Sequence, residues 1–273
     1  MKHISYSQYN TYVSCPRSWY LGKVRQAQEV QTWYIPIGSA VHDMVEAELS
    51  GPSPRSEGLG LKAEDFFYPL IERQMLIEPD LSKWLAGGPK GHPIVEELAL
   101  QVVKDCFEQS LEYLDEIDIW EVEYEATTML PGLEVPLKAF LDIIGEHKKK
   151  GPVVYDWKTG STKPNNFQLE TYGACLDQGL SQYSDVKFKG RYVMLKPGSP
   201  RTRFIEISPP SVDPAEVGAK YQAVYEQMKA KIYKTQHGFN CNFCFQQDNC
   251  LVNAGPTERA KYYDRSQEDG YPY

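Results

Sequence analysis

The sequence predicts a single α/β domain, because segments of helical periodicity surround a block in which apolar residues alternate with a period of two. Within this block we expect three strands, 119–130, 133–147 and 152–159, joined by Pro and Gly turns into an antiparallel meander. A second hairpin is expected from 186–195 and 202–208. At 273 residues the chain is long enough to bury a sizeable core, and it contains neither an internal repeat nor a low-complexity linker.

Helical segments flank these strands on both sides in the sequence. Helices are expected at 5–25, 38–49, 165–180 and 213–234, with several more inside a helical insertion at 61–118. Asp213 followed by Pro214 is a typical helix start, and Pro16 interrupts the first segment at a position where a helical turn can begin. The alternation of helices and strands is the basis of the α/β assignment.

The charge of the chain is unevenly distributed. The net charge is −8, but residues 43–125 hold 20 acids and 6 bases, so the rest of the chain is mildly basic. Nucleic-acid binding depends on where Lys and Arg lie more than on the total charge. The composition therefore permits a nucleic-acid partner without requiring one, and the acidic run is equally explained as a solvated face.

The cysteines and the termini indicate a reducing compartment. No run of 18 apolar residues is present and the amino terminus lacks the apolar core of a secretion signal, so we expect a cytoplasmic protein without a membrane span. In that compartment, clustered cysteines favour metal binding or catalysis over disulfides. Cys241, Cys244 and Cys250 lie within ten residues, which leaves a four-thiolate site one ligand short. Cys106 and Cys175 lie on helical apolar faces and are expected to be buried thiols.

Charged side chains in the predicted strands indicate a metal site. Asp156 and Lys158 are two residues apart on an apolar strand, so both side chains project from the same face. Asp142 is the one charged residue in an apolar stretch of the preceding strand, and a buried carboxylate needs a cation or a hydrogen-bond donor. Either aspartate alone is better explained by a capped turn or an ordinary ion pair. Together, on adjacent strands, they favour oxygen ligands for Mg²⁺ or Mn²⁺.

Two helices carry further candidates. His42 and Glu46 lie one helical turn apart at the edge of an apolar stripe, although a histidine in that position is often structural. Gln168 and Tyr172 share one face of the helix that follows the Lys158 strand.

The order of these residues resembles the RecB-like branch of the PD-(D/E)XK nuclease superfamily. The motifs of that branch stand here as Gly38–His42, Asp142, Asp156-Trp157-Lys158 and Gln168–Tyr172. One mild departure is Ala139, where the family usually has glycine three residues before the second-motif aspartate. The resemblance implies a restriction-endonuclease-like core, with a central mixed sheet flanked by helices and a helical insertion.

The resemblance also implies roles for the site residues. A divalent cation, Mg²⁺ or Mn²⁺, would be held by His42, Asp142, Asp156 and the main-chain carbonyl of Trp157. Lys158 would orient the attacking water and offset charge on phosphorus, Glu46 would hold a metal-bound water or a second ion, and Gln168 and Tyr172 would position substrate phosphate. In this interpretation Lys158, Asp142, Asp156, Gln168, Tyr172 and Glu46 form the catalytic group.

The amino-terminal segment resembles RecB-like nucleases that carry an iron–sulfur cluster, such as the AddB subunits and the CRISPR-adaptation nucleases. These place one cysteine before the nuclease core and a Cys-x₂-Cys-x₅-Cys pattern after it, and the chain shares their Cys-Pro step at Cys15-Pro16. The resemblance implies that Cys15 is the fourth ligand beside Cys241, Cys244 and Cys250, joining 1–25 to 235–254. Four thiolates can hold a [4Fe-4S] cluster or a tetrahedral zinc ion, and the resemblance favours the cluster.

The implied function is a metal-dependent DNA exonuclease that acts on single strands or DNA ends, in recombination, repair or CRISPR adaptation, in a bacterium, an archaeon or a phage. Because the chain has no P-loop motif, a motor would be a separate protein, and the expected partners are DNA, a helicase, an annealing protein, an integrase or a second copy. Residues 1–254 would form the nuclease domain and 255–273 a polar tail. Two alternatives stay open: a DNA-binding or assembly module without catalysis, and a zinc-stapled structure-specific endonuclease.

Overall fold

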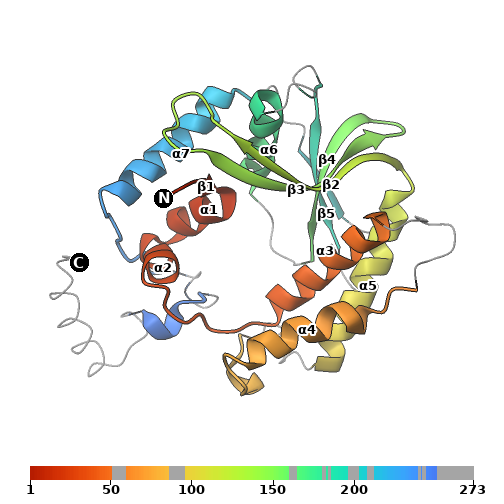
Figure 1. Cartoon of the computed structure of the whole chain (residues 1–273), viewed down its shortest axis with the longest axis horizontal. Helices are drawn as coiled ribbons and strands as arrows, with labels where there is room; N and C mark the ends of the chain where they lie inside the picture. Colours follow the sequence, from red (N-terminus) through yellow and green to blue (C-terminus); the bar gives the residue numbers. More distant parts are fainter. Residues whose placement is uncertain are drawn as a thin grey trace.

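A central mixed β-sheet with helices on both sides organises the molecule (Figure 1). The computed structural model describes residues 1–50, 60–85, 96–159, 165–179, 183, 186–195, 203–207, 212–238, 241 and 244–250, with only the backbone described at 179 and 203–207. The predicted tail, 255–273, lies outside these residues, so the proposed division of the chain into domain and tail stays a prediction.

Five strands of the sheet match the predicted ones to within a few residues, and the two-residue strand at the amino terminus was not predicted. They are β1 (Ile4–Ser5), β2 (Ile117–Thr128), β3 (Leu137–His147), β4 (Gly151–Lys158), β5 (Lys189–Met194) and β6 (Arg203–Ile207). The order is β1-β3-β4-β5-β6, with β2 on the other edge of β3. The β2–β3, β3–β4 and β5–β6 pairs are antiparallel, as the meander and the hairpin predicted, whereas β1–β3 and β4–β5 are parallel.

The helices of the described residues follow the predicted order. They are α1 (Tyr6–Ser14), α2 (Pro16–Trp19), the π-helical turn η1 (Tyr20–Val24), α3 (Tyr34–Ser50), α4 (Ala63–Met75), the 3₁₀ turn η2 (Leu81–Lys83), α5 (Glu96–Leu114), α6 (Asn166–Gly179), α7 (Pro214–Lys229) and the 3₁₀ turn η5 (Gln247–Asn249). None of the helices in the described residues has the length and apolar character needed to cross a membrane.

One helix prediction agrees with the structure and another needs correction. The interruption expected at Pro16 within 5–25 is present, because Cys15 is extended (φ −163°, ψ 105°) and separates α1 from α2. The residue before a proline is disfavoured in the helical region, so Pro16 ends one helix and starts the next. The helix expected over 38–49 begins earlier, at Tyr34, with Pro36 in its first turn. Its histidine motif therefore lies inside the helix and not at its start.

Both faces of the sheet are covered, which explains why β4 is apolar along most of its length. Val154 faces a core shared with α1, α6 and α7, whereas Val153 and Tyr155 face a second core shared with α3, α4 and α5. The helices of the predicted insertion at 61–118 contribute buried residues such as Phe67 and Val103 to this second core. They therefore form one layer of the fold together with α3.

The two ends of the described chain lie side by side (Figure 1), and contacts between residues 12–20 and 232–234, here called the terminal clasp, hold them together. The Tyr12 hydroxyl donates a hydrogen bond to the carbonyl of Ile232. The ring of Tyr20 stacks on that of Tyr233, with centroids 4.5 Å apart. These contacts place Cys15 close to the segment that carries the other three predicted cysteine ligands.

That cysteine segment is also held by hydrogen bonds of its own. The amide of Val30 donates to the carbonyl of Phe245 (2.8 Å), and the side chain of Asn249 donates to the carbonyl of Gln28 (2.7 Å). Gln246 between them is buried, 2% exposed, and its side chain contacts the carbonyl of Ala27. Residues 244–250 are therefore positioned by protein contacts on the loop that follows η1.

Candidate active site

The site forms where β3 and β4 separate. Their pairing ends at Ile143 opposite Tyr155, and β1 pairs with the same edge of β3 further along, at Leu137 and Lys138. Asp142 therefore lies at a gap in the ladder. Its Oδ2 accepts a hydrogen bond of 2.7 Å from the backbone amide of Trp157, across that gap. Because the ladder ends before these residues, the Trp157 amide bonds the buried carboxylate of Asp142 and not the backbone of β3.

Asp156 is held by three side chains. Its Oδ1 accepts hydrogen bonds from the Gln168 amide (2.7 Å) and the Tyr172 hydroxyl (2.9 Å), which lie one turn apart on α6. Its Oδ2 forms a close ion pair with the ammonium of Lys158 but accepts no well-aligned hydrogen bond. Asp156 is only 1% exposed, whereas the Lys158 side chain is about a third exposed. The lysine thus links a buried carboxylate to the solvent side of the site.

His42 approaches the aspartates from α3. Its Nδ1 lies 3.6 Å from Asp142 Oδ2 and 3.3 Å from Glu123 Oε1. Burial alone would lower the pKa of His42, but the two carboxylates raise it to about 9. Burial, with help from Asp156 and Glu123, raises the pKa of Asp142 to about 7 against the opposing effect of His42. The pKa values of His42 and Asp142 therefore depend on each other and on the charge of Glu123.

Glu123 was not among the predicted site residues. Val122 pairs with Ile143 and Tyr124 with Leu141, so Glu123 lies opposite Asp142 in the β2–β3 register. The signal in the sequence was the alternation of glutamates at 121, 123 and 125 on the strand next to Asp142. That pattern does not say which of the three approaches the site.

The structure brings together His42, Asp142, Asp156, Lys158, Gln168 and Tyr172 from four elements. Within the described residues, His42, Glu123 and Asp142 are the one group of three His, Cys, Asp or Glu side chains whose ligand atoms lie within 4.8 Å of one another. Glu46 is exposed on α3 and lies outside this group. The role given to the Trp157 carbonyl stays a prediction.

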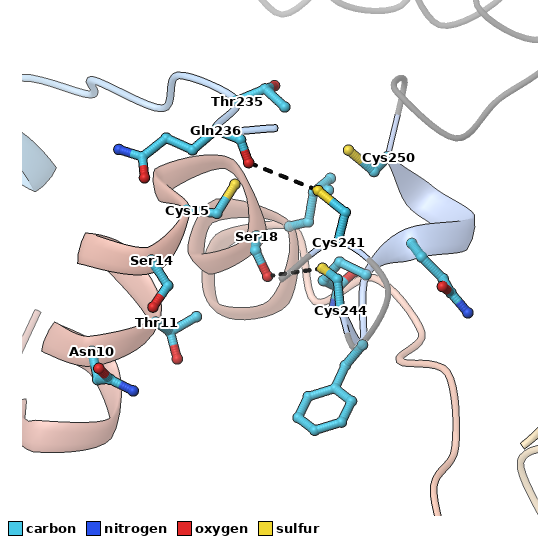
Figure 2. A pocket seen from close by; sticks show the side chains of 14 residues that line it. Asn10, Thr11, Ser14, Cys15, Ser18, Thr235, Gln236, Cys241, Cys244 and Cys250 are labelled. Carbon is cyan, nitrogen blue, oxygen red and sulfur yellow. Dashed lines mark hydrogen bonds between the residues drawn. The ribbon is translucent and has the colours of Figure 1, made fainter. Parts of the chain in front are cut away.

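The four predicted cysteine ligands surround a second site. Cys15, at the junction of α1 and α2, and Cys241, Cys244 and Cys250 line one cavity of about 340 Å³ (Figure 2). Cys244 Sγ lies 3.5 Å from the Ser18 hydroxyl. Among these described cysteines, no three sulfurs lie within 4.8 Å of one another.

The remaining two cysteines are buried in the cores, as predicted. Cys106 and Cys175 are both fully buried, and burial raises the pKa of each thiol to about 12. Both are therefore protonated, inert side chains at physiological pH.

A profile of the PD-(D/E)XK nuclease superfamily matches residues 3–250. The chain belongs to this superfamily. The match agrees with the mixed sheet flanked by helices and confirms the predicted fold class. The matched residues include β3 and β4, the helices α3 and α6, and the cysteine segment of this PD-(D/E)XK protein.

Comparison with one solved structure supports the same fold. The structure of “Putative exonuclease” from Eubacterium rectale is 11% identical, with a TM-score of 0.51, and covers 89% of this chain and 87% of its own. The structure of SSO0001 is 15% identical, with a TM-score of 0.34, and covers 79% of this chain and 96% of its own. No match is found among curated proteins.

Proposed function

We propose that the chain is a divalent-metal-dependent deoxyribonuclease of the RecB-like branch, which hydrolyses phosphodiester bonds in single-stranded DNA or at DNA ends. The observation that carries the proposal is the convergence of Asp142, Asp156 and Lys158 at the point where β3 and β4 separate. Superfamily membership supports nuclease chemistry at this site.

The donor set fits a divalent cation. Buried carboxylates and an imidazole within reach of one another are suited to Mg²⁺ or Mn²⁺, and an oxygen of Asp156 accepts no hydrogen bond although it is buried. His42, Asp142, Asp156 and the Trp157 carbonyl are the proposed ligands. When bound, the ion would polarise the scissile phosphate and stabilise the leaving oxyanion.

The protein groups around the ligands have separate roles in this proposal. Lys158 projects from the buried Asp156 toward solvent, where its ammonium can orient the attacking water and offset charge on the phosphorus. Gln168 and Tyr172 both bond Asp156, so we assign them to fixing its carboxylate. Glu46 is exposed and is left out of the ligand set.

Release of nucleotides from end-labelled single-stranded DNA in the presence of Mn²⁺ tests the proposal. Lys158→Ala should lower the rate by about 10²–10⁴-fold, the range for a positioned acid–base group. Lys104→Ala removes a half-buried lysine on α5 that pairs with Glu64, and it should leave the rate unchanged. Equal, null signals from wild type and Lys158→Ala would contradict the proposal and favour the DNA-binding module. Cutting of a circular single strand would indicate endonuclease activity.

We also propose that Cys15, Cys241, Cys244 and Cys250 hold a [4Fe-4S] cluster. All four side chains line one cavity. Tetrahedral zinc, with Zn–S near 2.3 Å, brings its sulfurs to about 3.8 Å from one another. In a [4Fe-4S] cluster the four thiolates bind four separate iron atoms, so their sulfurs lie further apart than around a single zinc ion. We further propose a role in recombination, repair or CRISPR adaptation, beside a separate motor, annealing protein or integrase, from the resemblance to RecB-like nucleases.

A further inference from the structure

We propose that Glu123 is an additional ligand of the divalent cation, so that α3, β2 and β3 each supply one side chain to it: His42, Glu123 and Asp142. The inference rests on the proposed function, because it concerns the same ion. It extends the predicted ligand set to a residue that belongs to none of the motifs seen in the sequence.

The first support is the position of the carboxylate. Glu123 Oε1 lies 3.3 Å from His42 Nδ1, and its ligand atom is within 4.8 Å of those of both His42 and Asp142. The pairs Val122–Ile143 and Tyr124–Leu141 bracket Glu123 and Asp142 in the β2–β3 register. Two carboxylates thus lie near each other on neighbouring strands, an arrangement that positive charge beside them stabilises.

The second support is a third buried carboxylate nearby. Asp156 Oδ2 is buried and accepts no hydrogen bond among the described residues, although it pairs electrostatically with Lys158. Asp156, Glu123 and Asp142 all lie close enough to interact electrostatically. Three carboxylates thus converge beside a single ammonium, that of Lys158. Such a set of oxygen donors is suited to a divalent cation.

The backbone of Glu123 is consistent with this role. Its φ is +46°, a value that residues other than glycine seldom adopt, whereas Val122 and Tyr124 on either side pair regularly with β3. Such conformations persist where surrounding structure holds them, and they concentrate at functional sites. Here the departure is confined to the residue whose carboxylate reaches His42.

Glu123 could instead only orient the imidazole through a hydrogen bond, and one variant separates the two roles. Glu123→Gln keeps a side-chain oxygen that can accept a hydrogen bond from His42 but removes the charge that a ligand supplies. Glu125→Gln is the matched control, because Glu125 lies two residues further along β2, is exposed and pairs with Lys138.

The test is titration of the full chain with MnCl₂ in the absence of DNA, followed by calorimetry and by the electron paramagnetic resonance signal of free Mn²⁺. Wild type and Glu125→Gln should bind with the same affinity, and Asp142→Asn should lose the site. Glu123→Gln should weaken binding by more than about 100-fold, because loss of a residue that only orients a ligand costs about 10–100-fold. Far-UV circular dichroism verifies that each variant is folded. If Glu123→Gln does not fold, anomalous scattering from a Mn²⁺-soaked wild-type crystal provides the readout, and the ion should lie within coordination distance of Glu123.

The outcomes are distinguishable. Wild-type affinity in Glu123→Gln, with loss in Asp142→Asn, overturns the inference and leaves the proposed function intact. A manganese ion in the crystal that contacts Asp142 but not Glu123 has the same meaning. Absence of Mn²⁺ binding by the wild-type protein overturns the inference and the proposed function together.

Discussion

At the scale of single residues, Glu123 carries a backbone cost that can be measured separately from its charge. In an ordinary strand, a protein with glycine is less stable than one with alanine by about 0.5–1 kcal/mol, because glycine loses more conformational freedom on folding. At a left-handed φ the order is reversed, since a Cβ there costs about 1–2 kcal/mol. The φ of +46° at Glu123 is left-handed, so glycine should be more stable than alanine at this position.

We therefore expect Glu123→Gly to be more stable than Glu123→Ala by about 1 kcal/mol, measured by urea unfolding with EDTA present. Both variants lack the carboxylate, so the lost interaction with His42 is common to them and cancels in the comparison. The same pair of substitutions at Glu125 should show the ordinary order, with alanine more stable. An identical order at both positions would show that the left-handed backbone has no energetic consequence.

The sequence was sufficient to group residues whose spacing places them on one face of a strand or helix. Asp156 and Lys158 had to share a face of their strand, and Gln168 and Tyr172 had to share a face of their helix, so their grouping around Asp156 follows from periodicity. Glu123 could not be chosen from the glutamates beside it. Its selection depends on strand register and on a local φ, and neither is encoded in a two-residue period.

At the scale of elements, close approaches to glycines show which contacts fix a helix in place. A Cβ at Gly218 of α7 would lie 2.3 Å from the carbonyl oxygen of Pro131, in the turn between β2 and β3. A Cβ at Gly173 of α6 would lie 3.6 Å from a methyl group of Val212, which is an ordinary contact. The two helices therefore differ in their tolerance of a methyl group.

Gly218→Ala should destabilise the protein by about 1–3 kcal/mol, because α7 must shift away from Pro131 and overpacking outweighs the gain in helix propensity. Gly173→Ala should stabilise it by about 0.5–1 kcal/mol, since the propensity gain is then unopposed. Urea unfolding midpoints measure both. If both alanine variants are stabilised, α7 does not depend on this backbone contact.

Element boundaries could be predicted where the local chemistry is decisive. Asp213 and Pro214 correctly start α7, and the strands around Asp142 were located within a few residues. The break at Cys15 was also expected, because Pro16 marks an interruption of the first helical segment. The role of α4 and α5 was not predictable, because an apolar stripe shows that a helix is covered and not what covers it.

At the scale of the whole molecule, the two ends of the described chain are joined in two ways. The terminal clasp joins residues 12–20 to 232–234 through the Tyr12 hydrogen bond and the stacking of Tyr20 on Tyr233. The four cysteines line a cavity beside it. Because the clasp involves no thiolate, a bound cluster would add to closure that protein contacts already provide.

Substitution of Cys15 separates the contribution of a bound cluster from that of the terminal clasp. Wild-type protein purified without oxygen should be brown, with broad absorption at about 400 nm from a thiolate-bound cluster, and Cys15→Ser should lose most of the colour and iron. The variant should nevertheless keep its far-UV circular dichroism spectrum and a cooperative thermal transition at a lower midpoint, because Tyr12, Tyr20 and Tyr233 are unchanged. Cys175→Ala, at a thiol buried away from the cavity, should keep the iron. Colourless wild-type protein containing zinc would contradict the cluster, whereas an unfolded Cys15→Ser variant would show that the clasp cannot hold the ends together alone.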